Sequence, residues 1–510
     1  MTRPIRLAIL LLTVLAVLGA LAGPAHADSR AATHIVQLRD GVGLAEGRAI
    51  VRAAHGRVMG NLPIIRGLAV RLSPAARARL ARDARVAAVS ANAPTRSLAK
   101  RPPSDGIDGS RLATAYVTSV LAPDVWPVAT GKKVGVAVID TGIDGALPDF
   151  AGANGQSRVL ASVVVNPDAA TPTDTYGHGT HVAGIIAGNG SRRGIEDPLV
   201  GNYIGGAPEA DLISIKASDD AGNGTILDAI YGLQFAVDHQ SEFNIRVVNL
   251  SLASTVAESY TTDPLDAAVE SAYFHGILVV AAAGNRGADA GATSYSPGND
   301  PFALTVGAVD DQGTDDRADD VFTDWSSVGK TQDGFSKPEI AAPGAHIVST
   351  LAPGSAFADM CPACVVDQDY IRLGGTSMAA PVVSGVAALV FEAHPTWTPD
   401  KVKSTLIQTS RDVAGGVNEV NAAAALAVSA PFSGANSGVA PNTLVDPAGG
   451  AIDYARSSWG RSSWGAAPGS LTAGWARSSW GCSCPNSSSD AAESTRSSWG
   501  SASWLSRWDY

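Results

Sequence analysis

The sequence predicts an α/β fold whose main part is a three-layer, doubly wound and mostly parallel sheet. From about residue 130 to residue 430, short and nearly continuous apolar runs alternate with helical patterns. Strands that are apolar throughout are typical of a parallel sheet covered by helices on both faces. The chain has 510 residues, of which 45% are apolar and 17% charged, so it can build a large core. We expect a small α+β domain before this sheet and a disordered tail after it.

Residues 1–27 have the pattern of a secretory signal peptide. Arg3 and Arg6 precede an apolar run over 7–21, and Ala25 and Ala27 form a small-x-small cleavage site. A membrane anchor is the alternative, but the run is short for a bilayer span and a Gly-Pro pair interrupts it. We therefore predict cleavage and a secreted, extracellular protein.

The pattern of residues 28–100 predicts a compact α+β unit of three strands and two helices, with room for one more strand. Its expected elements are strands over 34–38, 67–72 and 86–89, a helix over 45–55, and a second helix that Ser73 and Pro74 open. The polar stretch 96–109 predicts a linker to the main domain, because it holds a Pro-Pro pair and glycine.

Charge is distributed unevenly along the chain. The net charge of −11 argues against nucleic acid as a partner. Residues 28–100 hold 13 basic and 4 acidic side chains, whereas residues 101–430 hold 17 basic and 39 acidic ones. Opposite charge of this size predicts that the two segments attract each other.

Residues 101–430 form the predicted main domain. Its apolar runs cover 134–139, 212–215, 247–252, 277–283 and 302–309, and its helical patterns cover 178–187, 225–237, 263–274 and 377–391. In open parallel sheets, functional sites form beyond the carboxyl ends of the strands. The polar residues that follow these runs are therefore the first candidates for chemistry.

Residues 431–510 change in character to Ser, Gly, Ala and Trp. The motif Arg-Ser-Ser-Trp-Gly occurs at 456–460, 461–465, 477–481 and 496–500, and seven of the ten tryptophans lie in this part of the chain. Because the repeats have neither a helical nor a strand period, they favour a low-complexity, disordered tail. The regular aromatic spacing leaves a second interpretation open, in which the tail contacts the cell envelope or a partner surface.

The four cysteines are too few for a fold built on disulfides. They fall as the pairs Cys361/Cys364 and Cys482/Cys484, and export favours oxidised thiols. A zinc site is disfavoured, because no second Cys-x-x-Cys or His pair lies at ligand spacing. We favour a local Cys361–Cys364 bridge in a surface loop.

Four polar residues stand where a strand ends or a helix begins. Asp140 ends one apolar run, Asn285 ends another, His178 opens a helix, and Ser377 follows a glycine pair before a long apolar helix. Each has an ordinary structural explanation by itself, as a turn residue or helix cap. His178 and His181 lack the spacing of a zinc protease, so His181 is predicted to be a packed core residue.

Together, the order Asp140, His178, Asn285, Ser377 and its flanking motifs resemble the subtilisin-like serine peptidases. The chain order Asp, His, Ser is that of subtilisin. The resemblance extends from about residue 115 to 428 and includes Asp-Thr-Gly at 140–142, Gly-His-Gly-Thr-His at 177–181 and Gly-Thr-Ser-Met-Ala at 375–379. It implies a secreted serine endopeptidase acting on protein or peptide substrates through an acyl-enzyme intermediate.

The resemblance also implies a role for each residue. Ser377 would be the nucleophile, His178 the general base, Asp140 the residue that orients the imidazole, and Asn285 an oxyanion donor. Substrate would bind along Ser251, Leu252 and Ala253, opposite a pocket wall formed by Ala282, Ala283 and Gly284. Ala253 departs from the pattern, since relatives commonly have glycine there. Because its methyl group could narrow the pocket, the sequence does not determine which substrate side chain is preferred.

The resemblance further implies that residues 28–100 are an inhibitory propeptide, removed by self-cleavage between Thr95 and Ile107. No cofactor is expected for catalysis, and we expect a monomer. Calcium is a weaker expectation: the acidic stretch 310–320 could bind an ion, but its spacing matches no calcium loop, and a solvated loop is favoured. As an alternative function, the tail would bind a surface and the peptidase would serve maturation only.

Overall fold

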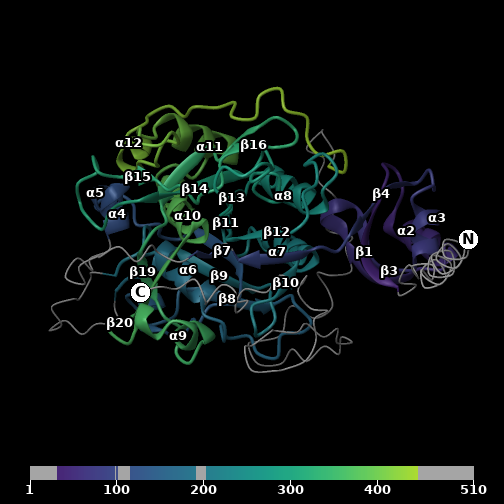
Figure 1. Cartoon of the computed structure of the whole chain (residues 1–510), viewed down its shortest axis with the longest axis horizontal. Coiled ribbons are helices and arrows are strands. Elements are labelled where there is room, and N and C mark those ends of the chain that lie inside the picture. The colour runs from purple at the N-terminus through teal and green to yellow at the C-terminus, as the bar shows by residue number, and fades with distance from the viewer. Residues whose placement is uncertain (1–30, 98, 101–114, 191–202, 446–510) are drawn as a thin grey trace, which may run out of the picture.

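A computed structural model describes residues 31–97, 99–100, 115–190 and 203–445. The predicted signal peptide, Cys482, Cys484 and the tryptophan repeats lie outside the described residues. In Figure 1 the chain forms a large body and a smaller N-terminal module beside it.

The N-terminal module is an antiparallel sheet covered by two helices. Its strands are β1 (Ala32–Leu38), β2 (Arg57–Leu62), β3 (Gly67–Leu72) and β4 (Val86–Ala91), in the order β2-β3-β1-β4. Its helices are α2 (Leu44–Ala53) and α3 (Pro74–Leu80), and the 3-10 turn η1 (Pro63–Ile65) follows β2. The Ser73 side chain caps α3 by accepting from Ala76 N at 3.2 Å. Strand β2 occupies the place of the additional strand for which the sequence left room.

The main sheet confirms the predicted mostly parallel architecture. Within the described residues its strand order is β15-β14-β13-β11-β7-β9-β8, with β18 beside β14. These strands are β7 (Gly135–Asp140), β8 (Val159–Val164), β9 (Asp211–Lys216), β11 (Ile245–Leu250), β13 (Leu278–Ala282), β14 (Leu304–Asp310), β15 (Val321–Phe322) and β18 (Ile340–Pro343). Only the β14–β15 pair is antiparallel among them.

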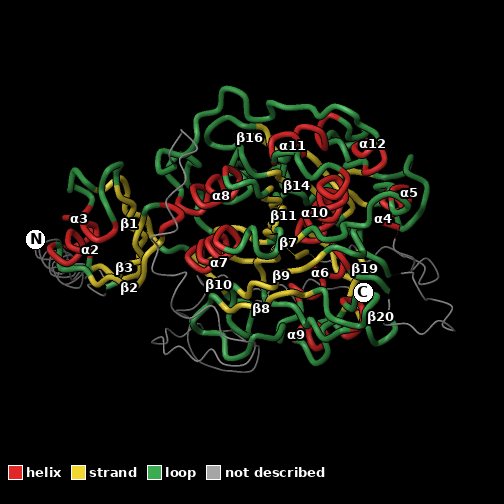
Figure 2. The backbone as a smooth tube through the Cα atoms, turned by 180° about the vertical axis from the view of Figure 1, so that it is seen from behind, coloured by secondary structure: helices red, strands yellow, loops and turns green. Residues whose placement is uncertain are grey.

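Helices cover both faces of this sheet, as Figures 1 and 2 show. The helices of the body are α4 (Ala115–Ser119), α5 (Ala122–Val125), α6 (His178–Ala187), α7 (Ile226–Asp238), α8 (Pro264–Phe274), α9 (Ala356–Met360), α10 (Thr376–Ala393), α11 (Pro399–Gln408) and α12 (Ala422–Leu426). Successive residues of β7 point to opposite faces. Val136 and Val138 pack with α6 and α10, whereas Ala137 and Ile139 pack with α7 and α8.

Helix α10 is apolar around its whole circumference because it lies inside the domain. By length and composition it could cross a membrane, but 89% of the helix is buried in the protein. This is the burial expected of a core helix.

Several short strands lie outside the main sheet. They are β5 (Pro94–Ser97), β6 (Ala99–Lys100), β10 (Gly224–Thr225), β12 (Leu252–Ser254), β16 (Gly329–Lys330), β17 (Ser336–Lys337), β19 (Ile347–Thr350), β20 (Val365–Val366) and β21 (Tyr370–Gly375). Strand β5 lies between β10 and β12, and β6 pairs with β21. The stretch predicted as a linker from residue 96 therefore begins as strand, because the body supplies partner strands on both sides.

The predicted tail also begins later than its composition indicates. Residues 431–445 are described and run along the body, with Asn442 and Leu444 buried. They are held by specific hydrogen bonds, first to α11 and then to the region before α8, rather than by an apolar period of their own. Residues 446–510, with all the repeats, lie outside the described residues.

Candidate active site

Asp140 and His178 meet at the carboxyl edge of the main sheet. Asp140 is the last residue of β7, and His178 is the first residue of α6. Their side chains are joined by a 2.7 Å contact between Asp140 Oδ1 and His178 Nδ1, and both are buried. Because a carboxylate only accepts, Nδ1 carries a proton and neutral His178 has its basic lone pair on Nε2.

Asp174, which the sequence analysis missed, positions this pair. Its Oδ1 accepts from Gly177 N at 2.7 Å and from Thr141 Oγ1 at 2.8 Å, and its Oδ2 accepts from Thr180 N at 2.7 Å. Gly177 has φ 108°, in the left-handed region that favours glycine. Asp174 thus satisfies free N–H groups at the start of α6 and joins that helix to the residue after Asp140. Burial raises the pKa of Asp174, against the effect of these donors.

Ser377 lies in the first turn of α10, which begins at Thr376. Its Oγ donates to the backbone oxygen of Ser251 at 3.1 Å, and Ser251 Oγ donates to the backbone oxygen of Ser377 at 2.9 Å. A side-chain chain extends this contact: Asn249 Nδ2 donates to Ser251 Oγ, and Ser384 Oγ donates to Asn249 Oδ1, each at 2.9 Å. The start of α10 is therefore locked to the end of β11.

Neighbouring parallel strands bring the candidates together. Strands β7, β11 and β13 are adjacent in the sheet, and their carboxyl ends lie at one edge. Asp140 ends β7, Ser251 follows β11, and Asn285 comes three residues after β13. Helices α6 and α10, which begin with His178 and Thr376, pack against each other on one face of the sheet.

The side chain of Asn285 is oriented by Thr376. Asn285 Oδ1 accepts from Thr376 N and from Thr376 Oγ1, both at 3.0 Å. An amide whose oxygen is used in this way must present its NH₂ group elsewhere. Within the described part of the chain, Nδ2 of Asn285 has no hydrogen-bond partner. The half-buried amide is thus a donor available beside the start of α10.

The predicted substrate edge is paired in the structure. Strand β12, with Leu252 and Ala253, is antiparallel to β5, and Leu252 lies opposite Ser97 while Ala253 lies opposite Arg96. Extended chain beside a strand edge is the arrangement by which peptides add to a sheet. The same N-terminal segment continues as β6, where Ala99 lies opposite Gly375.

The other predicted wall consists of small buried residues. Ala282, Ala283 and Gly284 follow one another at the end of β13. Gly284 has φ 107°, and a Cβ atom there would lie 2.8 Å from Ser327 Oγ. Both the backbone angle and this contact require glycine, and the turn leads directly into Asn285.

A disulfide-bearing segment packs beside His178. Cys361 and Cys364 are bonded, as predicted, directly after α9. Phe357 of α9 contacts the His178 ring edge to face, with ring centroids 6.0 Å apart. Ala356 N and Phe357 N donate to the backbone oxygens of Thr175 and Tyr176 at 3.0 and 3.1 Å, just before α6. This segment supports the loop that presents His178.

The second histidine of the motif is a core residue, as predicted. His181 Nε2 donates to the backbone oxygens of Ile347 and Ile371, at 3.2 and 3.0 Å. Burial lowers the pKa of His181 to about 3, and its neighbour His178 adds to the shift. His181 is therefore neutral at ordinary pH and ties α6 to strands β19 and β21.

Carboxylates of the predicted acidic loop, residues 310–320, bond to other groups of the protein. Asp320 accepts from Ser119 Oγ at 2.9 Å and pairs with Arg411, and Asp311 Oδ1 accepts from Gly313 N at 3.0 Å. Among the described residues, no group of three or more His, Cys, Asp or Glu side chains is arranged to hold a metal ion. The sequence favours a solvated loop here, and this holds for Asp315, Asp316 and Asp319, which are exposed, but not for Asp311 and Asp320, which are buried.

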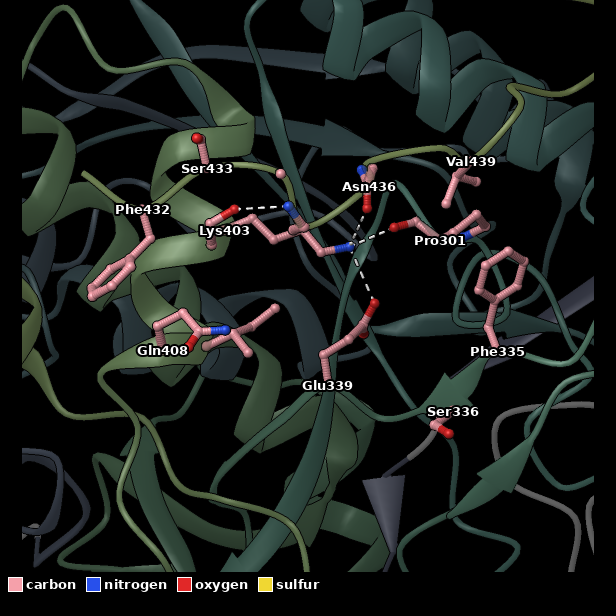
Figure 3. Close-up of a pocket in the computed structure, with 14 residues that line it drawn as sticks. Pro301, Phe335, Ser336, Glu339, Lys403, Gln408, Phe432, Ser433, Asn436 and Val439 are labelled. Atoms are coloured by element: carbon pink, nitrogen blue, oxygen red, sulfur yellow. Dashed lines mark hydrogen bonds and ion pairs between the residues drawn. The ribbon is translucent and has the colours of Figure 1, made fainter.

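A pocket is formed by residues other than the catalytic candidates. It has a volume of ≈ 430 Å³ and is lined in part by Glu339, Lys403 and Asn436, which Figure 3 shows linked through the Lys403 ammonium. Asp140, His178 and Ser377 do not line it. Lys337 lies nearby and donates to Glu339 Oε1 at 2.7 Å, so ammonium groups fill this oxygen-rich region.

Comparison with known proteins agrees with this geometry. Residues 131–426 match the model of the Subtilase family. The serine protease AprX of Bacillus subtilis (strain 168) is 38% identical over 282 residues, which cover 54% of this chain and 61% of AprX. Subtilisin Savinase of Lederbergia lenta is 36% identical over 300 residues, covering 58% of this chain and 91% of that protein. The chain thus spans about three fifths of the length of AprX and of several other curated subtilisins.

A solved structure extends the likeness beyond the family-matched region. The crystal structure of fervidolysin from Fervidobacterium pennivorans, described as a keratinolytic enzyme related to subtilisin, superposes with a TM-score of 0.60 at 25% identity. The superposition covers 79% of this chain and 62% of fervidolysin. With the matching family model and the residues gathered at the carboxyl edge of the sheet, these likenesses establish that the chain belongs to the subtilase family.

Proposed function

We propose that this protein is a secreted serine endopeptidase that cuts peptide bonds through an acyl-enzyme intermediate. The observation that carries the proposal is the 2.7 Å bond between Asp140 and His178 at the sheet edge where α10 begins with Thr376 and Ser377. A serine in the first turn of α10, a helix packed against the α6 helix that begins with the carboxylate-oriented His178, is suited to nucleophilic acyl transfer.

In the proposed reaction, Ser377 Oγ attacks the carbonyl carbon of the substrate while His178 Nε2 takes the hydroxyl proton. Asp140 keeps the imidazole in the required tautomer and stabilises its protonated form. His178 then gives this proton to the leaving amine, and the C–N bond breaks. Water enters, His178 takes a proton from it, and the acyl–oxygen bond to Ser377 is hydrolysed with return of the proton to Oγ.

The negative oxygen of the tetrahedral intermediate would be bound by Asn285 Nδ2 and by Ser377 N. Support comes from the two bonds by which Thr376 holds Asn285 Oδ1 and so directs the NH₂ group elsewhere. Fixed donors aimed at developing charge are commonly the largest contribution to such catalysis. The start of α10 adds the positive end of its dipole.

We further propose that the segment predicted at 28–100 is a propeptide that the enzyme removes by itself, with its C-terminal end at Leu98. In support, β5 and β6 pair with β12 and β21, the strands on either side of the candidate nucleophile. In the sequence, Leu98 alone separates the two ladders, and it lies outside the described residues. The partner strands continue toward the nucleophile with Ser251 and Thr376, so we propose cleavage between Leu98 and Ala99.

The substrate would be an extended polypeptide that pairs with β12. Ala253 is buried and its backbone takes part in the ladder with Arg96. Small residues at 282–284 leave room for an apolar side chain such as that of Leu98. We propose that the mature enzyme prefers leucine-sized apolar residues before the cut.

Export would follow from residues 1–27, whose pattern is that of a signal peptide. The Arg-Ser-Ser-Trp-Gly repeats favour a second candidate function, in which the tail binds a surface at the cell envelope. Deletion of residues 446–510 separates the two: casein hydrolysis in solution should remain, and retention on envelopes should fall only if the tail binds there.

The test of the main proposal is labelling with a serine-directed phosphonate. The secreted protein should bind one equivalent at Ser377 and lose casein hydrolysis in proportion. A purified Ser377→Ala chain that still hydrolyses casein fully would refute the assignment. Asn285→Asp, which keeps the acceptor for Thr376, should still be labelled but more slowly.

A further inference from the structure

A short C-terminal segment, residues 441–445, crosses the region before and along α8. Asn442 is 1% exposed and its N–H donates to the Glu270 carboxylate, at 2.7 and 2.9 Å. Asn442 Nδ2 donates to the backbone oxygens of Tyr260 and of Asp263, the latter at 2.9 Å. These bonds satisfy a buried side chain and fix the segment's path over the body.

The same segment contacts the N-terminal module. Leu444 is 2% exposed and belongs to the apolar cluster that contains Ile64 and Ile65 of η1. The backbone oxygen of Leu444 accepts from Arg66 Nη2 at 3.2 Å, and Leu444 N donates to Asn442 Oδ1 at 3.0 Å. One face of the segment is thus bonded to the body and the other to the module.

The module has its own contacts to the body at this place. Ile64 N donates to Gln234 Oε1 of α7 at 2.7 Å, and η1 packs against α8. Figure 1 shows the yellow end of the described chain running past α8 toward the module. The turn η1 is therefore enclosed by α7, α8 and residues 441–445.

We propose that residues 441–445 form a C-terminal clasp that holds the N-terminal module on the body and slows its release. The clasp lies beyond residue 426, where the family-matched region ends. The inference rests on the proposed function in one respect: release of the module matters because the module is the proposed propeptide. Its physical basis, the contacts of Leu444, is independent of catalysis.

The clasp gives the C-terminal region a regulatory consequence. Displacing Leu444 from its site removes a buried side chain from the apolar cluster that also contains residues of η1 and α8, and it breaks the bond from Arg66. The module would then be held by its remaining contacts, which include those to α7 and α8 and the β5 ladder. Any cut that frees residues 441–445 from Glu270 would accelerate release of the module after processing.

Hydrogen–deuterium exchange in the full-length Ser377→Ala chain tests the clasp without proteolysis. Leu444→Ala should speed exchange at the amides of Ile64 and Ile65 by at least about tenfold. Arg66→Ala should give an increase of roughly three- to tenfold, because it removes one hydrogen bond across the interface. Exchange within the core strands β7 and β11 should not change in either variant.

Two matched controls separate the clasp from general destabilisation. Asp40→Ala removes the ion pair of Arg66 inside the module but leaves the bond to Leu444, and Ser437→Ala alters an exposed side chain before the clasp. Neither should change exchange at Ile64. Unchanged exchange at η1 in Leu444→Ala, or equal acceleration in the controls, would overturn the proposal.

The active chain supplies a second measurement. With Leu444→Ala, the delay between appearance of the processed protein and full casein hydrolysis should shorten by at least about tenfold relative to Ser437→Ala. If no chain hydrolyses casein, the proposed function fails, while the exchange result still decides whether the clasp exists. If casein is hydrolysed and neither delay nor exchange changes, only the clasp is refuted.

Discussion

Asp174 accepts a hydrogen bond from Thr141 Oγ1 at 2.8 Å, and this bond joins the residue after Asp140 to the loop that precedes His178. Thr141 Oγ1 in turn accepts from Gly179 N at 2.9 Å, in the first turn of α6. Strand β7 and helix α6 are therefore held in a fixed relation by a bonded group that touches neither substrate nor nucleophile. Asp174 is a positioning residue for the Asp140–His178 pair.

We predict that Asp174→Ala lowers kcat about 10²-fold, the loss expected when catalytic groups shift by about 1 Å. KM should change little, since β12 is not disturbed. Asp174→Asn keeps one acceptor oxygen and should recover part of kcat. A role in folding alone would instead lower the amount of active enzyme, with the kcat per phosphonate-labelled site unchanged.

Asn285→Ala should lower kcat by about 10²–10³, the loss measured when the equivalent donor of subtilisin is removed. Asn285→Asp is the matched variant, because its carboxylate still accepts from Thr376 but cannot donate. Both variants should lose kcat similarly, and Asn285→Ala should also lower the free energy of unfolding by about 1 kcal/mol through the unpaired Thr376 N–H. Wild-type kcat in Asn285→Asp would exclude the donor role.

Mass spectrometry of the secreted protein should find a mature N-terminus at Ala99. The expectation follows from the two ladders, in which Ser97 lies opposite Leu252 and Ala99 opposite Gly375. The Ser377→Ala chain should persist with residues 28–98 attached when expressed in a protease-deficient host. A mature chain that starts at Leu98 or beyond Lys100, or maturation of Ser377→Ala, would contradict this scheme.

Much of the fold follows from local pattern, and the main exceptions need tertiary contacts. The runs at 134–139 and 247–252 are apolar throughout and match β7 and β11, because both faces of these strands are covered. Strands β5 and β6 could not be predicted, since the polar sequence at 94–100 becomes strand only beside β12 and β21. The fixed path of residues 441–445 likewise could not be predicted, because it depends on the hydrogen bond from Asn442 N to the Glu270 carboxylate.

The candidate site likewise contains residues that the sequence indicates and one residue whose role depends on tertiary contacts. Asp140, His178, Asn285 and Ser377 are singled out by their order and flanking motifs, which resemble the family, because their places at strand ends or helix starts are ambiguous when each is taken alone. Asp174 could not, because it lies in a polar stretch and its role depends on bonds to Thr141, Gly177 and Thr180 that only folding brings together. An aspartate four residues before His178 was the available signal, but many loops contain one.

A chelator should leave the melting temperature of the Ser377→Ala chain unchanged. Carboxylates of the 310–320 loop are bonded to protein groups, and Lys403 donates to Ala303 O at 2.8 Å and to Glu339 Oε1 at 3.1 Å in an oxygen-rich region. The ammonium groups of Lys403 and of neighbouring Lys337 supply the positive charge that a metal cation would otherwise supply in this region. A fall of several degrees with chelator, reversed by calcium, would contradict this prediction.

Stability should fall as pH rises from about 4 to about 7, in part because of Asp311. Burial raises the pKa of Asp311 to about 7, and the nearby carboxylates of Asp310 and Glu419 add to the shift. The unfolded chain ionises near the usual pKa of about 3.9, so it binds fewer protons than the folded chain over this window. The stabilising contribution of the neutral carboxyl is complete below about pH 4 and is lost as pH approaches 7.

Asp311→Asn directly tests this predicted loss of stability with rising pH, in the Ser377→Ala background, where autolysis is avoided. The amide oxygen can still accept from Gly313 N and needs no ionisation. We expect the variant to melt near the parent temperature at pH 4.5 and several degrees higher at pH 8, since the cost of a buried charge is removed. Asp316→Asn, at an exposed position of the same loop, should show no such difference. Equal melting temperatures of Asp311→Asn and parent at pH 8 would show that Asp311 ionises without penalty in the folded protein.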